Sequence, residues 1–312
     1  MIDILVLFQQ VLILVLCVIP GLALKKAKLV GVDFGVGLSN LVLYIATPAM
    51  IILSFLREFD PHLIFRAGIV ALFCLLFHVL FFLVSHLLYR RAPIDIKKVL
   101  RFVTVFTNAG YMGIPLIQSL FGDEAVIFAT FYVVFFNIFV WTLGCFIFTH
   151  DRSYISLRKA FLNPATISIT IGFICLLTSV VRYLPPLSVN FLTMLNNLVA
   201  PLSMFIIGLG LADLKWKGFF KDLYMYQFLL VRMILLPTAC FALLKIATLF
   251  GFDDPVAASA LFICASTPGA TATSMFAEKF GGNARYAGKL VSVSTILSVG
   301  TMPLVALWMK LL

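Results

Sequence analysis

The residues best suited to bind a ligand lie in two proline-containing stretches of an otherwise apolar sequence. The first runs from Thr107 to Pro115 and reads TNAGYMGIP, and the second runs from Ser266 to Thr273 and reads STPGATAT. Proline lacks an N–H and its ring clashes with the carbonyl four residues earlier, so each stretch interrupts a helix, the first near Tyr111. An interrupted helix exposes the N–H groups that begin its second half, and these attract anions. If the two helices cross, both helix starts point at one anion-binding spot.

A single proline in a membrane helix is usually only a tolerated kink. That interpretation holds for five other prolines taken alone: Pro20, Pro48, Pro201, Pro237 and Pro303. Pro115 and Pro268 differ because glycines and hydroxyl side chains surround them. Unpaired backbone groups persist at membrane depth only inside protein or beside a water-filled cavity, which favours a binding site.

The composition places these stretches in a membrane. Of the 312 residues, 62% are hydrophobic and 12% are charged, whereas soluble domains are about 45–50% apolar and about 25% charged. A helix needs about 20 residues to cross a bilayer. Ten ranges are long and apolar enough: 4–24 (a retained first span), 35–56, 63–89, 97–121, 124–149, 161–182, 187–212, 218–249, 255–280 and 285–310. We predict an all-α membrane protein of ten transmembrane helices, with residues 1–312 forming a single transporter domain.

The basic residues predict the orientation. The net charge is +10, but Lys and Arg occur in short clusters between apolar ranges, which argues against nucleic-acid binding. The loops after spans 1, 3, 5, 7 and 9 carry 16 of them, and the other loops and the termini carry four: Arg57, Arg66, Arg182 and Lys310. The positive-inside rule therefore places the odd-numbered loops in the cytoplasm and both termini outside, in the plasma membrane.

The two halves of the chain resemble each other. Four positions recur at an offset of 159 residues: Thr107, Gly110, Phe121 and Gly122 match Ser266, Gly269, Phe280 and Gly281. Five spans per half is an odd number, so the second half must be inverted. We therefore predict two inverted five-helix repeats, about 1–150 and about 160–312, with crossing broken helices 4 and 9, an arrangement typical of transporters.

Other polar residues within the spans allow two interpretations each. Arg232 lies near mid-membrane, where it could contact a substrate carboxylate, snorkel, or donate to backbone carbonyls. Asn137 and Ser294 could line the crossing or form interhelical hydrogen bonds. His78 is typical of a packing residue, and Lys289 of a snorkelling side chain.

Several stretches resemble the auxin efflux carrier family over nearly the whole chain. They are TNAGYMGIPLIQSLFGDEA in span 4, STPGATATSMFAEKFGGNA in span 9, TILSVGTMPLVALW after it, APLSMFIIGLGLADL in span 7, and Asn163-Pro164 at the start of span 6. The resemblance implies a ten-helix fold related to bile acid–sodium symporters. It also implies a scaffold of spans 1, 2, 6 and 7, a moving transport domain of spans 3–5 and 8–10, and a homodimer.

In that family the asparagine that matches Asn108 binds the substrate carboxylate. Plant members carry a second asparagine or glutamine near the span 9 break, where this chain has Thr267-Pro268-Gly269. The expected substrate-binding residues are Asn108, Gly110, Gly113, Pro115, Thr267, Pro268, Gly269, Thr271, Thr273, Asn137, Arg232 and Ser294.

Together these features predict a secondary transporter, an auxin efflux carrier-like permease that moves a small organic anion by alternating access. Coupling to H⁺ or Na⁺ stays open. Three rivals remain: a sodium-coupled symporter of the bile-acid type, a passive channel and a non-transporting sensor. The sequence contains no Ser/His dyad, paired carboxylates or HExxH motif, so an enzyme is not expected, and no cofactor or metal site is predicted.

Overall fold

The computed structural model describes residues 9, 12–31, 33–58, 60–151, 153, 155–156, 158, 161–212 and 222–309. The predicted starts of the first span (residue 4) and the eighth span (residue 218) lie outside these residues. So do six of the basic residues used to predict the orientation: Arg152, Lys159, Lys215, Lys217, Lys221 and Lys310.

Within the described residues the chain is helical, and the one β-type contact is an isolated bridge. The α-helices of the first half are α2 (Val18–Lys26), α3 (Phe34–Leu41), α4 (Thr47–Phe55), α5 (Pro61–Leu88), α6 (Ile94–Val105), α7 (Ile114–Phe121), α8 (Asp123–Phe139) and α9 (Cys145–Thr149). Those of the second half are α11 (Pro164–Leu177), α12 (Pro186–Asn196), α13 (Val199–Ala212), α14 (Leu223–Leu230), α15 (Leu236–Leu249), α16 (Pro255–Ser266), α17 (Ala272–Lys279) and α18 (Ala284–Met309). Four π turns and a 3₁₀ turn join some of them: η1 (Val42–Ala46), η2 (Ala109–Gly113), η3 (Val140–Gly144), η7 (Val231–Leu235) and η5 (Val180–Arg182).

Five continuous helical stretches of the described chain are long and apolar enough to cross a membrane: Phe34–Phe55, Phe65–Leu88, Ala125–Thr149, Pro186–Ala212 and Leu223–Leu249. The bent pair Ala284–Ser298 and Gly300–Met309 makes a sixth. The all-helical class is therefore confirmed for the described residues, and these apolar stretches are consistent with the predicted membrane protein. The described residues of all ten predicted ranges include helices, but ten crossings and the inverted repeat remain predictions. Spans 4 and 9 are not continuous because each is divided into two shorter helices.

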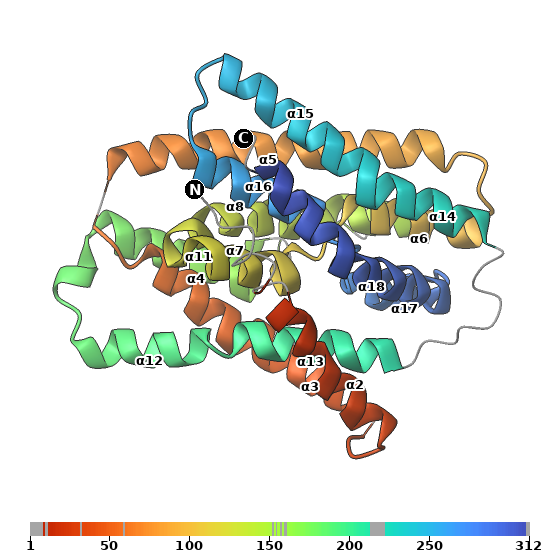
Figure 1. Ribbon diagram of the computed structural model, residues 1–312, viewed down its shortest axis with the longest axis horizontal. Helices are drawn as coiled ribbons and strands as arrows, with labels where there is room; N and C mark the ends of the chain where they lie inside the picture. Colours follow the sequence, from red (N-terminus) through yellow and green to blue (C-terminus); the bar gives the residue numbers. More distant parts are fainter. Residues whose placement is uncertain are drawn as a thin grey trace.

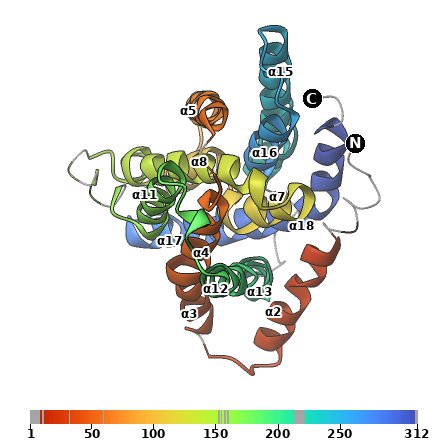
Figure 2. The same ribbon diagram turned by 90° about the vertical axis from the view of Figure 1, so that its left-hand side faces the viewer.

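The helices form two groups, and the second includes halves of the two divided spans, α7 and α16. Figure 2 shows α2, α3, α12 and α13 on one side and α5, α15 and α16 on the other. In the first group α2 packs along α13, and α4 contacts α11 and α12; in the second, α8 contacts α5, α7 and α16. Contacts of α4 with α8, and of α13 with η2 and α18, join the groups, and Figure 1 shows α2 crossing α13 within the first group.

Three π turns precede prolines by the same spacing. η1, η2 and η7 each begin six residues before a proline, namely Pro48, Pro115 and Pro237. In each case the N–H of the residue before the proline donates to the carbonyl five residues earlier. The wider turn accommodates the ring and the missing N–H, so the helix continues through all three prolines.

This accommodation moves the interruption of span 4. The helix was expected to break near Tyr111, but Tyr111 lies inside η2, and the helical bonding stops instead at Phe106–Asn108. In span 9 it stops at Thr267, beside Pro268, as the sequence indicates. Pro115 therefore shapes the second half of span 4 without itself breaking the helix.

Glycines bring α2 and α13 into direct backbone contact. A Cβ on Gly208 would lie 2.1 Å from the carbonyl oxygen of Val18, and a Cβ on Gly21 would lie 2.2 Å from that of Phe205. No side chain fits at either position. Helix pairs in membranes commonly approach through small residues in this way.

Candidate functional site

The two interruptions cross and pair with each other. Thr107 and Gly269 form an isolated antiparallel bridge. The N–H of Asn108 donates to the carbonyl of Pro268 at 2.8 Å, and the N–H of Ala270 donates to the carbonyl of Phe106 at 2.9 Å. These two bonds give partners to two N–H groups and two carbonyls that the interruptions would otherwise leave unpaired at membrane depth. We call this paired segment, Phe106–Asn108 with Thr267–Ala270, the crossing.

Two glycines permit the close approach. A Cβ on Gly269 would lie 2.3 Å from Cγ2 of Val103, and a Cβ on Gly113 would lie 3.3 Å from Cγ2 of Thr267. By contrast, a Cβ on Gly110 would meet nothing within 4 Å. Gly113 and Gly269 therefore allow the two spans to pack closely, whereas Gly110 borders open space.

The direction of pairing arranges the helix dipoles. Because the strands are antiparallel, Phe106, at the end of α6, lies opposite Ala270, just before α17. Asn108, just before η2, lies opposite Pro268, just after α16. Each helix start therefore lies beside a helix end, instead of both starts meeting at one point as expected. With roughly half a positive charge at each start and half a negative charge at each end, the four dipoles nearly cancel.

Arg232 changes this balance. It lies on η7 and is fully buried. Its Nε donates to the carbonyl of Thr267 at 3.1 Å, its Nη1 donates to that of Thr104 at 3.2 Å, and its Nη2 donates to that of Ala265. Thr104 and Ala265 lie in the last turns of α6 and α16, so the guanidinium occupies the negative ends of both helices. The positive helix starts are left uncancelled.

The helix starts retain donors for a ligand. In the described structure the N–H groups of Ala109, Gly110 and Tyr111 at the start of η2, and of Thr271 and Ala272 at the start of α17, show no hydrogen-bond acceptor. The side-chain Nδ2 of Asn108 is also without a partner, although the residue is only 3% exposed. A buried amide without a partner costs free energy unless a ligand or water completes its hydrogen bond.

Two cavities lie between α13 and these helix starts. One is lined by apolar and hydroxyl side chains: Leu14, Val15, Val18, Met112, Leu116, Met204, Ile207, Thr295 and Ser298. The other is lined by Ile206, Ile207, Gly210, Leu211, Thr271, Val291, Ser292 and Thr295. They share Ile207 and Thr295, so an apolar region adjoins one bordered by hydroxyl groups and by the start of α17.

The structure brings most of the predicted site residues to the crossing or beside it. Asn108, Thr267, Pro268 and Gly269 form part of it, and Arg232 donates to its carbonyls. Ser294 accepts a hydrogen bond from the N–H of Gly269 at 3.2 Å. Gly110, Gly113 and Pro115 follow along η2 and α7, Thr271 borders a cavity, and the Thr273 hydroxyl donates to the carbonyl of Ala270.

Asn137 differs, because its side chain donates to the carbonyl of Val133 on its own helix, α8, at 2.9 Å. The sequence reasoning missed Ser266 as a site residue. Its hydroxyl is buried without a partner at the last residue of α16, next to the crossing. The signal in the sequence that could have identified Ser266 is a hydroxyl side chain directly before Thr-Pro-Gly.

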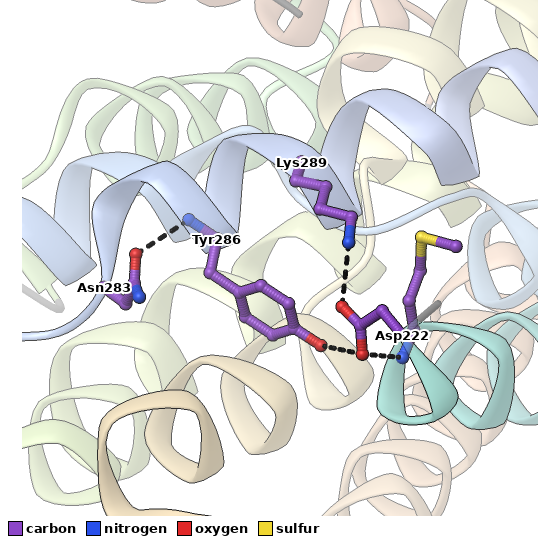
Figure 3. A network of polar contacts seen from close by, with 5 residues as sticks. Asp222, Asn283, Tyr286 and Lys289 are labelled. Atoms are coloured by element: carbon purple, nitrogen blue, oxygen red, sulfur yellow. Dashed lines mark hydrogen bonds and ion pairs between the residues drawn. The ribbon is translucent and has the colours of Figure 1, made fainter. Parts of the chain in front are cut away.

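A second polar network lies away from the crossing, at the starts of α14 and α18 (Figure 3). Asp222 accepts from the N–H of Met225 at 3.1 Å, from the Tyr286 hydroxyl at 3.3 Å and from the Lys289 ammonium at 2.8 Å. Lys289, expected to snorkel, is thus an ion-pair partner. Partial burial raises the pKa of Asp222, but the bonds from Lys289, Met225 and Tyr286 outweigh it and hold the pKa below its usual value.

Comparison with known proteins decides the family. A family model described as "Membrane transport protein" matches residues 6–157 and 148–306. The chain belongs to the membrane transport protein family. This confirms the resemblance to auxin efflux carriers, and with it the assignment as a membrane transporter.

A similar protein is also described as a transporter. The transporter is 23% identical, over 307 residues and 96% of each chain, to a protein of Methanocaldococcus jannaschii described as an uncharacterized transporter. The two proteins therefore match over nearly their full lengths, and the divided spans lie within the matched family ranges.

Proposed function

We propose that the protein is a secondary transporter that moves a small organic anion, a carboxylate, across the plasma membrane by alternating access. The observation that carries this proposal is the chemistry at the crossing. Donors without acceptors, including Asn108 Nδ2 and the first N–H groups of η2 and α17, lie at the crossing, where the buried Arg232 binds the carbonyl of Thr267. All of these groups favour negative charge.

The charge balance supports an anion over a cation or a zwitterion. Arg232 forms no ion pair with an acidic side chain among the described residues, and its bonds are to backbone carbonyls. A buried positive charge without a counter-ion is unfavourable. A bound carboxylate would supply the missing negative charge and also accept from Asn108 and the helix starts.

The cavities suggest where the substrate binds. They separate α13, which belongs to the expected scaffold, from η2, α17 and α18, which belong to the expected transport domain. In this proposal the scaffold, spans 1, 2, 6 and 7, stays fixed and forms the homodimer. Spans 3–5 and 8–10 move as a body and expose the crossing to each side in turn, with the lysine-rich loops in the cytoplasm.

The experiment is a thermal-shift screen of the purified protein against mono- and dicarboxylates, followed by uptake of the best ligand into proteoliposomes. Asn108→Ala should weaken binding about 10- to 100-fold, since a hydrogen bond to a charged group contributes about 1.5–3 kcal/mol. Asn137→Ala is the matched control and should bind normally, because its amide nitrogen donates to a carbonyl of its own helix, α8.

Two outcomes would contradict the proposal. One is that no carboxylate shifts the melting temperature or enters the vesicles. The other is that Asn108→Ala binds as tightly as the unmodified protein. Counterflow of labelled substrate separates a carrier from a channel, because only a carrier exchanges internal for external substrate against a gradient. Binding without any uptake would indicate a sensor.

A further inference from the structure

Arg232 reaches the crossing from a neighbouring helix. It lies on η7 of the continuous stretch Leu223–Leu249, and its side chain is fully buried. Its Cζ lies 4.9 Å from the centre of the Phe81 ring on α5, so an aromatic face covers the guanidinium as well. Three nitrogens of the guanidinium each donate to a different backbone carbonyl.

The carbonyls that bind Arg232 are those that the interruptions leave open. At the end of α16, the carbonyl of Ile263 accepts the N–H of Thr267 and that of Cys264 accepts the Thr267 hydroxyl. At the crossing, the carbonyls of Phe106 and Pro268 accept backbone N–H groups. Those of Thr104, Ala265 and Thr267 accept from the guanidinium. Arg232 thus donates hydrogen bonds to carbonyls at the ends of both helices.

Converging carbonyl oxygens at interrupted helices are also the groups that bind a metal cation in membrane carriers. Here a guanidinium attached to the chain already uses three of them. We propose that Arg232 is a positioning residue that acts as a built-in cation: it fixes the crossing and supplies the positive charge that a dissociable sodium ion would otherwise supply. The fold of the crossing, and anion binding to it, then need no sodium.

The first test measures the thermal stability of the protein in the absence of substrate. Arg232→Ala should lower the melting temperature of the purified protein by about 10 °C, because it leaves three buried carbonyls without donors. Guanidinium chloride or methylguanidinium chloride at low millimolar concentration should restore most of this loss. Met233→Ala is the matched control: it truncates a neighbouring buried side chain, and guanidinium should not restore its stability.

The inference fails if Arg232→Ala has the same melting temperature as the unmodified protein. It also fails if guanidinium changes the melting temperatures of Arg232→Ala and Met233→Ala equally. If Arg232→Ala does not fold, Arg232→Lys serves in its place. It keeps the charge but not the planar set of donors, so it should be destabilised less than Arg232→Ala yet still be rescued by guanidinium. Equal stability of Arg232→Lys and the unmodified protein would overturn a role for the guanidinium geometry.

The second test concerns sodium and rests on the proposed function. Uptake of the carboxylate by the unmodified protein, and its melting temperature, should be unchanged when sodium is replaced by choline. Uptake that requires sodium would refute the built-in cation while leaving anion transport intact. Absence of any anion uptake, with guanidinium rescue of Arg232→Ala still observed, would instead refute the proposed function alone.

Discussion

Thr107 and Gly269 lie opposite each other in an antiparallel bridge although they come from opposite halves of the chain. The bridge holds the two interrupted spans in one register. It sets Asn108 beside Pro268 and Phe106 beside Ala270, and it thereby decides which helix ends Arg232 can reach. The geometry of the whole candidate site depends on this short pairing.

Gly269→Ala should disturb that pairing. The added Cβ would lie 2.3 Å from Cγ2 of Val103, a branched and buried side chain that cannot swing aside. Overpacking of this kind costs about 1–3 kcal/mol, measurable as a lower melting temperature. Gly110→Ala is the control, since its Cβ meets nothing within 4 Å. Equal melting of the two variants would show that the crossing is looser than described.

Gly208→Ala should separate α2 from α13. Its Cβ would lie 2.1 Å from the carbonyl oxygen of Val18 and 2.8 Å from the backbone nitrogen of Leu22, and backbone atoms cannot move aside as a flexible side chain would. We expect a loss of stability of at least about 1–3 kcal/mol in a detergent melt. Gly210→Ala, two residues further along α13 with nothing within 4 Å of its Cβ, should melt normally.

The Asp222 network predicts a dependence of stability on acid pH. The pKa of Asp222 is lower in the folded protein than in the unfolded chain, so the folded state favours the ionised carboxylate. Its contribution is therefore complete above the unfolded pKa of about 4 and is lost as the pH falls toward the lower folded value. Asp222→Asn should show a flatter fall in melting temperature between about pH 5 and pH 3 than the unmodified protein.

Lys289, the ion-pair partner of Asp222, provides a check on this prediction. Lys289→Met should likewise flatten the curve, and the double variant should add little to either single change, because one interaction is removed in all three. Additive effects would show that the Asp222–Lys289 pair is not what makes the protein sensitive to acid.

Much of the site could be predicted from the sequence because proline and glycine act locally. Pro268 lies beside the interruption of span 9, and the Gly110-to-Gly113 stretch follows that of span 4. The place of the first interruption could not be predicted, since a π turn absorbs Pro115 and only the surrounding packing selects that turn over a break.

Side-chain contacts between residues distant in sequence could not be predicted either, for the same reason. From the sequence, Arg232 could contact a substrate, snorkel to the lipid interface or donate to backbone carbonyls. Only the fold shows that it donates to the carbonyls of Thr104 and Ala265. Lys289 resembled a snorkelling side chain because the sequence of its own helix, α18, does not indicate that Asp222, at the start of α14, lies beside it. Each of these contacts joins two helices and depends on how they pack.

The shared hydrogen bonds of the crossing also have a consequence for how the protein is made. When the ribosome has completed α6, the carbonyls of Thr104 and Phe106 have no donors, because Arg232 and Ala270 are not yet synthesised. The nascent first half must therefore keep this region hydrated or shielded by the insertion machinery until the second half arrives. The two halves mature together, and neither reaches its final form in the bilayer on its own.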